Sequence, residues 1–448
     1  MELFLIDAVG PFFRGYEKAR INWSKVPFEH LHTEGPAREK QWSQIRKDMA
    51  TLAQEIREIG YNAVTLDDVI HLVDHECYEP DIQKKISVFR EEYRVLFAIF
   101  QEHGLRIFLN QDVMSFTSAS RREAYGRRGK AIGFLEELIG RFFDDFPEVE
   151  GMVLRIGESD GLDVEGDFRS ELVLRSARQV RRMLTRLLPT FEDRGKKLIF
   201  RTWTVGAFSV GDLIWHQRTL ARVVRGISSP SLILSMKYGE SDFFRYLPLN
   251  RLFFETDLPK IVELQCRREY EGCGEFPSFV GGDYEMVAQS LMDAENMVGI
   301  SVWCQTGGWV PFRRLAFLEP EGIWNEINAE VTLRMFRHGE LVEEAVKRVG
   351  ERRGLGDPVA FQELLRLSEE AVKDLLYVSG FASQTLYLRR VRIPPLIGIY
   401  WNTVFINAMV RRILRAMDLD REEIVREGKL ALRKVERMKE LAPAAGVP

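Results

Sequence analysis

Acidic and basic side chains follow two strand-like segments in the middle of the chain. The segment Ile233–Phe244 has an apolar run followed by Lys237 and Asp242, and the segment Ile261–Tyr270 has a second apolar run that ends near Glu269. In a parallel α/β barrel, the buried strands present the reacting side chains at their carboxyl ends, which surround one mouth. We therefore predict that Lys237, Asp242 and Glu269 converge on one pocket.

The ends of the predicted strands as a whole are rich in charged and aromatic residues. These positions hold carboxylates, two cations and two indoles: Asp67, Asp68, Asp112, Glu158, Asp160, Arg201, Trp203, Lys237, Asp242, Glu269 and Trp309. Glycoside hydrolysis requires one protonated acid for the leaving oxygen and one ionised carboxylate as base or nucleophile. Arg201 and Lys237 would suit a substrate that itself carries a carboxylate.

Each of these residues also has a purely structural interpretation. Arg201 and Lys237 could neutralise acidic neighbours in the barrel mouth. The pair Asp67 and Asp68 could cap the helix that follows. The remaining candidates, which could be solvated acids or packed indoles, are Glu158, Asp160, Trp203 and Trp309.

The elements that must position these residues alternate between strand and helix. The predicted strands are 3–9, 61–66, 105–110, 151–156, 197–203, 231–237, 260–266 and 299–303. The predicted helices between them are 41–60, 86–103, 131–146, 168–194, 210–225, a short helix near 243–254, and 284–297. A glycine separates a helix from the next strand at three points, Gly60, Gly104 and Gly195. Eight such units are typical of a (β/α)8 TIM barrel.

The alternation is lost after Pro320. The predicted helices in this part are 323–338, 340–351, 358–378, 399–417 and 421–441. The sequence therefore predicts an α/β barrel over residues 1–320 and an α-helical C-terminal domain over residues 321–448.

Composition excludes several other classes of protein. Among 448 residues, 45% are hydrophobic and 29% are charged, and the 63 basic and 67 acidic residues are interspersed, which gives no signature of nucleic-acid binding. No run approaches the roughly 18 apolar residues that a membrane span requires, and the N-terminus predicts a first strand and not a signal peptide. The four cysteines have no metal-ligand spacing. We expect reduced thiols, a cytoplasmic protein, and no metal or cofactor.

The two central segments resemble the catalytic barrel of the family 67 α-glucuronidases. The family has a lysine, a glycine two residues later, and an aspartate followed by phenylalanine, matched here by Lys237, Gly239, Asp242 and Phe243. A Leu-Glu-Leu-Gln-like run that leads to Glu-Tyr is matched by ELQCRREY, which contains Glu269. Similar stretches, GYNAVTLDDV, HGLRIFLNQD and KLIFRTW, extend the resemblance over about residues 1–337.

The resemblance implies an exo-acting, inverting α-glucuronidase-like glycosidase that removes an α-linked uronic acid from an oligosaccharide. Asp242 and Glu269 would act on the hydrolytic water as general base, and Arg201 and Lys237 would bind the sugar carboxylate. The acidic stretch RIGESDG corresponds to the family's general-acid motif, with Glu158 as first choice. Asp160 is the second choice for the acid. Further substrate contacts would come from Asp160, Trp203, Trp309, Asp67 and Asp68. The family's N-terminal β-sandwich has no expected counterpart, because the first strand begins at residue 3.

Two other functions stay open at this stage. Lys237 stands at the end of a barrel strand, where a Schiff-base lyase or aldolase would place its amine, although Glu240 and Asp242 oppose the neutral form that this chemistry needs. A non-catalytic carbohydrate-binding barrel is the third possibility. The expected partner is an oligosaccharide or glycoside, without nucleic acid or membrane, and a homodimer through the helical domain is left open.

Overall fold

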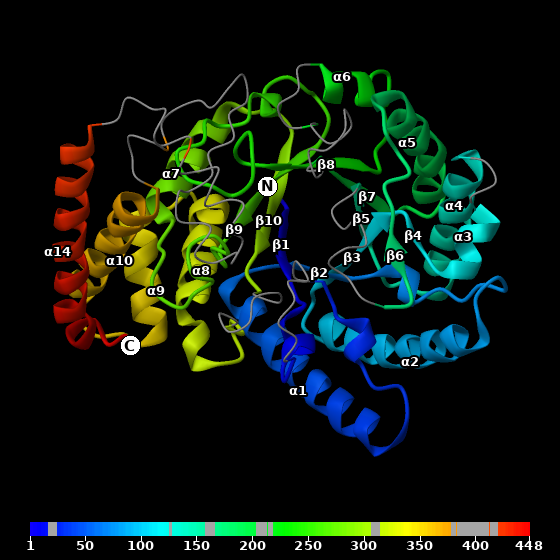
Figure 1. Ribbon diagram of the computed structural model, residues 1–448, viewed down its shortest axis with the longest axis horizontal. Helices are drawn as coiled ribbons and strands as arrows, with labels where there is room; N and C mark the ends of the chain where they lie inside the picture. Colours follow the sequence, from blue (N-terminus) through cyan, green and yellow to red (C-terminus); the bar gives the residue numbers. More distant parts are fainter. Residues whose placement is uncertain are drawn as a thin grey trace. The chain divides into compact units, whose positions relative to one another are not determined.

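The computed structural model describes residues 1–16, 25–124, 128–156, 166–202, 213, 218–305, 314–377, 382, 412 and 420–448. Within these residues, eight parallel strands close into a barrel (Figure 1). They are β1 (Leu3–Asp7), β2 (Ala63–Asp67), β3 (Arg106–Val113), β5 (Gly151–Ile156), β7 (Lys197–Arg201), β8 (Leu232–Lys237), β9 (Lys260–Gln265) and β10 (Met297–Trp303). Each barrel strand neighbours the next one in the chain, and β10 returns to β1, so the predicted (β/α)8 barrel is confirmed.

An apolar layer fills the barrel. Its members come from seven of the eight strands and are Leu3, Leu5, Ala63, Phe108, Val153, Ile199, Ile233 and Ile261. Gly299 on β10 lies in register with Leu3 on β1. A Cβ atom on Gly299 would lie 1.8 Å from the carbonyl oxygen of Leu3, so the pairing that closes the barrel requires glycine at this position.

Helices connect successive strands and lie outside the barrel sheet (Figure 1). In the first half of the chain they are α1 (Gly35–Ile59), α2 (Pro80–Glu102), α3 (Ser118–Ala124), α4 (Arg128–Asp145), α5 (Ala177–Glu192) and α6 (Thr219–Val224). The predicted stop after α1 is correct, because Gly60 has a φ of 112° and its amide donates to the carbonyls of Ile56 and Arg57.

The predicted long helix over 168–194 begins too early. The side chain of Ser176 accepts a hydrogen bond from the amide of Gln179 and starts α5 at Ala177. Before that cap, β6 (Arg169–Ser170) pairs antiparallel with β4 (Ser115–Phe116). One short strand, β6, and the residues up to Ser176 therefore replace the first turns of the predicted helix.

The chain divides into two compact units that do not follow chain order. Unit 1 comprises Met1–Lys237, Arg251–Glu263 and Glu295–Pro311. Unit 2 comprises Tyr238–Asn250, Leu264–Ala294 and Phe312–Pro448. The segments that follow β8 and β9 thus belong to the same unit as the C-terminal helices. A domain boundary at residue 320 stays a prediction.

Unit 2 is mainly helical in its described residues. Its helices are α7 (Gly281–Ser290), α8 (Ile323–His338), α9 (Val342–Arg353), α10 (Pro358–Val372), which runs into a π-helical turn (Lys373–Tyr377), and α14 (Arg421–Ala445). The last two helices, α10 and α14, pack side by side (Figure 1). The side chain of Asp420 caps α14 by accepting hydrogen bonds from the amides of Glu422 and Glu423, both at 3.0 Å. The helix predicted over 399–417 lies outside the described residues, apart from Arg412.

Short 3₁₀ turns complete the described elements: η1 (Gly10–Phe13), η2 (Phe28–His30), η3 (Val69–His71), η4 (Arg251–Phe253), η5 (Leu291–Asp293) and η6 (Pro320–Gly322). The four cysteines are free thiols, as predicted. Among the described helices, none is both long and apolar enough to cross a membrane.

Candidate active site

A layer of charged and polar side chains follows the apolar layer of the barrel. Side chains alternate between the two faces of a strand, so residues two or four positions after an inward residue also point inward. The members of this layer are buried and lie near the carboxyl ends of their strands: Asp7, Asp67, Asp112, Arg155, Arg201, Ser235, Lys237 and Glu263. These polar side chains of the described residues therefore lie within the last residues of their strands and not beyond them.

Arg155 joins two carboxylates of this layer. Its Nε donates to Asp112 Oδ1 at 3.0 Å, and its Nη2 donates to Asp67 Oδ1 at 3.4 Å. The ammonium group of Lys25 also donates to Asp112, as does the Ser170 hydroxyl at 3.0 Å. Two cations and two acids are thus buried together without net charge.

The two acids titrate in opposite directions. Burial raises the pKa of Asp67, and the nearby Arg155 offsets this only in part. Burial also opposes ionisation of Asp112, but Arg155 and Lys25 outweigh it and hold the pKa of Asp112 well below its usual range. Carboxylates whose pKa values separate in this way are suited to one acidic and one basic role.

The depressed pKa of Asp112 predicts a loss of stability in acid. The pKa of Asp112 is lower in the folded than in the unfolded protein, so its ionised carboxylate stabilises the fold at neutral pH. This stabilisation is lost as the pH falls below about 3.9, the usual aspartate value. We expect the free energy of unfolding, measured with urea from pH 6 to pH 2.5, to decline over this range. In the variant Asp112→Asn the decline should be shallower by up to about 1.4 kcal/mol per pH unit. Equal slopes in the two proteins would contradict the assignment.

Arg201 pairs with an acid that the sequence prediction missed. Its Nε donates to both carboxylate oxygens of Glu263, at 2.9 and 2.8 Å, and its guanidinium lies 4.8 Å from the centroid of the Trp303 ring. Glu263 also accepts from the Ser235 hydroxyl at 2.7 Å and from Trp303 Nε1 at 3.4 Å. The neutralising interpretation of Arg201 is therefore what the structure shows. The sequence feature that could have predicted Glu263 is its position two residues after Ile261, whose side chain points into the barrel.

Asp242 and Glu269 lie in unit 2, and Tyr270 is a neighbour of both. The Tyr270 hydroxyl donates to Asp242 Oδ2 at 2.5 Å. Glu269 accepts from Gln265 Nε2 at 2.7 Å and from Arg267 Nη2 at 2.9 Å. Burial raises the pKa of Tyr270 well above its usual value, and the charges of Asp242 and Glu269 raise it further, so the phenol stays protonated. The neutral phenol of Tyr270 thus joins the loop that carries Glu269 to Asp242.

The other predicted residues have separate placements. Asp68 accepts from the amide of His71 at 3.3 Å and lies 2.6 Å from His71 Nδ1, so the capping interpretation describes it, although the element it caps is a 3₁₀ turn. Lys237 is buried at the end of β8, in register with Glu263. Arg201, Lys237, Asp67 and Asp68 all belong to unit 1. Four predicted site residues lie outside the described part of the chain: Glu158, Asp160, Trp203 and Trp309. Convergence on one pocket stays a prediction.

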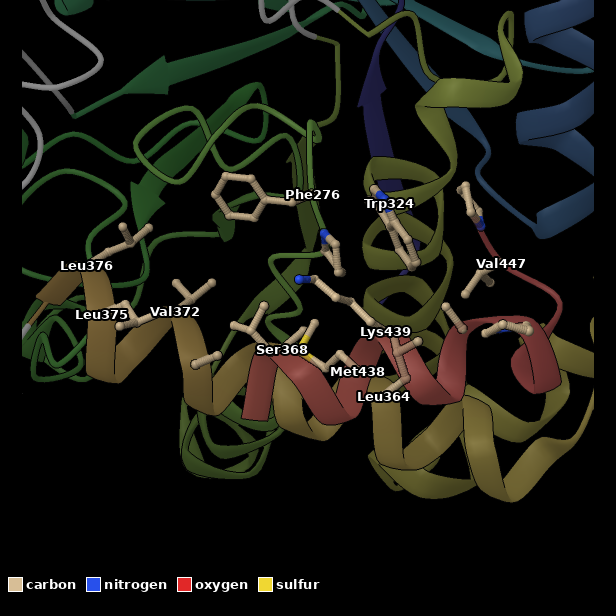
Figure 2. Close-up of a pocket in the computed structure, with 16 residues that line it drawn as sticks. Phe276, Trp324, Leu364, Ser368, Val372, Leu375, Leu376, Met438, Lys439 and Val447 are labelled. Carbon is tan, nitrogen blue, oxygen red and sulfur yellow. The ribbon is translucent and has the colours of Figure 1, made fainter. Parts of the chain in front are cut away.

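Unit 2 also contains an apolar cavity of about 560 Å³. Side chains of α8, α10 and α14 converge on it, with Trp324, Leu364 and Met438 among them (Figure 2). No aspartate or glutamate is among its described lining residues, so these side chains provide no acid and base for hydrolysis. Part of its wall, Phe276 and Val372, belongs to the same hydrophobic cluster as Tyr270.

Among the described residues, one group has the geometry to hold a metal ion: His75, Glu76 and Glu137. The guanidinium of Arg141 already lies between its acids and donates to Glu76 at 3.1 Å and to Glu137 at 2.6 Å. An organic cation thus neutralises the two carboxylates, and we assign no metal there.

Comparison with known proteins supports the fold. No protein-family model and no curated protein matches the sequence. A GH138 enzyme targeting pectin rhamnogalacturonan II has a similar structure, with a TM-score of 0.54 and 11% identity over 86% of this chain. The chain spans 45% of the length of that enzyme. At this identity the similarity shows the barrel fold alone.

Two further solved structures are similar at lower scores. GH5_18 from Streptomyces cattleya in complex with GlcNAc has a TM-score of 0.41 and 12% identity, covering 67% of this chain and 76% of that one. The β-mannanase from the blue mussel Mytilus edulis has a TM-score of 0.40 and 13% identity, covering 76% of this chain and 94% of that one. We draw no argument from similarities at this level.

Proposed function

We propose that this chain is a glycoside hydrolase that releases an α-linked uronic acid from an oligosaccharide. The observation that carries the proposal is the arrangement after β8 and β9, where the neutral phenol of Tyr270 donates to Asp242 and Glu269 directly precedes Tyr270 in the chain. Support also comes from the barrel, which is similar to that of an enzyme targeting a pectin. The mechanism is acid–base hydrolysis with inversion of the anomeric centre.

In this mechanism Asp242 and Glu269 orient a water molecule, and Asp242 takes its proton. Tyr270 donates a hydrogen bond to Asp242, which stabilises the ionised carboxylate before the reaction. Arg267 and Gln265 hold Glu269 through one hydrogen bond to each carboxylate oxygen. Glu158 is assigned the role of general acid, which protonates the glycosidic oxygen as the bond breaks.

In this proposal, two cations of unit 1 bind the carboxylate of the substrate: Arg201 and Lys237. Arg201 binds Glu263 through Nε, and the proposal assigns the same guanidinium to the substrate carboxylate. The fork of a guanidinium matches the two oxygens of a carboxylate, which a neutral sugar lacks. Selectivity for uronic acids over neutral sugars follows from this assignment.

The test is hydrolysis of aryl-glycosides and uronic-acid oligosaccharides, followed by proton NMR of the fresh product. We expect release of a uronic acid whose first-formed anomer is inverted, because an inverting site keeps its acid and base roughly 6.5–9.5 Å apart to admit water. A retained anomer would contradict the mechanism. Absence of hydrolysis on every uronide would contradict the function itself.

One observation favours a lyase or aldolase. Lys237 is only 2% exposed at the end of β8, and a Schiff-base lysine is commonly buried in this way. Its register partner on β9 is Glu263, an acid that would favour the charged and unreactive ammonium form. Borohydride trapping with a keto acid distinguishes the lyase from the hydrolase. A covalent adduct at Lys237 supports the lyase, and the absence of an adduct supports the hydrolase.

A further inference from the structure

Non-glycine residues with left-handed backbone occur in both loops that carry the proposed carboxylates. Tyr246 has a φ of 62° in the loop after β8, and Arg268 and Cys273 have φ values of 47° and 53° in the loop after β9. Such conformations are unfavourable for residues with a Cβ atom and persist only where the surroundings hold them. Something must therefore fix these two loops in shape.

A buried cluster centred on Glu271 provides this restraint. Arg245 donates to Glu271 Oε1 from Nε at 3.1 Å and to Oε2 from Nη2 at 2.9 Å. Arg268 donates to the same carboxylate from Nε at 3.0 Å and also from Nη2. The Tyr377 hydroxyl adds a hydrogen bond to Glu271 Oε1 at 2.6 Å. The side chains of Arg245, Arg268 and Glu271 are at most 1% exposed.

Electrostatics favours the charged state of this cluster. Burial opposes ionisation of Glu271, but Arg245 and Arg268 outweigh it and hold the pKa of Glu271 well below its usual range. Arg245 is further bound to Asp283 at 3.1 Å, which adds a second acid beside the two arginines. Removing one member would leave an uncompensated buried charge, so the cluster acts as a single unit.

The cluster connects the two loops directly. Arg245 lies three residues after Asp242, and Glu271 lies two residues after Glu269. Arg268 Nη2 also donates to the carbonyl oxygen of Phe243, the residue next to Asp242, at 3.2 Å. We infer that Arg245, Arg268 and Glu271 are positioning residues that fix the separation of Asp242 and Glu269. This inference rests on the proposed function for the roles of those two acids.

Unit 2 contains a second buried glutamate that serves as a matched control. Glu330 in α8 accepts from Arg352 Nε and Nη2, both at 2.7 Å, and from Arg353 Nε at 3.2 Å. Its side chain is 0% exposed, like that of Glu271. Both are buried glutamates held by two arginines, but Arg352 and Arg353 are 29% and 14% exposed and lie in α9, not in the loops that carry Asp242 and Glu269.

The experiment compares Glu271→Gln with Glu330→Gln by peptide-resolved hydrogen–deuterium exchange. In Glu271→Gln, amides in both 238–250 and 264–276 should exchange at least about tenfold faster than in the wild type, because both loops lose their common anchor. In Glu330→Gln, these peptides should keep the wild-type rate. The inference would be overturned if the two loops exchanged at the same rate in Glu271→Gln as in Glu330→Gln. It would also be overturned if only one of the two loops exchanged faster in Glu271→Gln.

Two additions keep the result decisive. If Glu271→Gln does not fold, Tyr377→Phe removes one hydrogen bond to Glu271 and should accelerate the same two peptides, whereas unchanged exchange would overturn the inference. On any glycoside that the wild type hydrolyses, Glu271→Gln should lower kcat by about a hundredfold, while Glu330→Gln keeps it. The exchange measurement needs no substrate, so a failure of the proposed hydrolysis is seen separately from a failure of the positioning role.

Discussion

Replacing Asp242 with asparagine is expected to lower kcat for uronide hydrolysis by about 10²–10⁴-fold with little change in KM. Asparagine has the same shape and can still accept the hydrogen bond from Tyr270 through its amide oxygen. It cannot take a proton from water, so the substrate binds but the attacking nucleophile is not formed. Steady-state kinetics on the best substrate of the wild type measures the effect.

The pH dependence gives a second measure of the same role. In the wild type, kcat/KM should fall on the acidic side as the base becomes protonated, and Asp242→Asn should lose this limb. Glu275 lies six residues after Glu269 and pairs with Arg314 at 2.5 Å near the surface, so Glu275→Gln should retain the wild-type kcat. Wild-type activity in both Asp242→Asn and Glu269→Gln would exclude these two acids as the base.

The barrel could be predicted from the sequence because its signals are local. Apolar runs of strand length alternate with amphipathic helices, and glycines such as Gly60 mark the ends of helices through their left-handed backbone. The strands 151–156 and 231–237 were predicted within one residue of β5 and β8. The start of α5 was wrong, because the Ser176 cap is a weaker signal than the helical periodicity around it.

The partners of the charged residues could not be predicted in the same way. Arg201 and Glu263 are 62 residues apart, and Asp242 and Tyr270 are 28 apart, so no local pattern connects them. The prediction considered only charged residues at or after the end of each strand. It therefore overlooked Glu263, which lies inside β9 and faces the barrel interior. A rule based on the two-residue alternation of each strand would have included it.

The second large effect concerns Arg155 in the barrel mouth. Replacing it with methionine should lower the free energy of unfolding by about 3–5 kcal/mol at pH 7, because Asp67 and Asp112 lose the cation between them while remaining buried. Lys25 remains as a partner of Asp112. Urea unfolding of the variant and the wild type measures the difference. The surface pair of Arg186 with Glu136 is a control, and Arg186→Met should cost below about 1 kcal/mol.

A double variant separates the cost of unpaired charge from the loss of packing at Arg155. With Arg155→Met and Asp67→Asn combined, Lys25 and Asp112 remain as a neutral pair, so stability should recover well above that of Arg155→Met alone. The deficit of the single variant should also shrink as the pH is lowered from 7 to 4, because burial raises the pKa of Asp67 and its protonation removes the unpaired charge. If the double variant is no more stable than Arg155→Met and the deficit is independent of pH, packing and not charge accounts for the role of Arg155. In that case the neutral group of two cations and two acids would not be what holds the barrel mouth together.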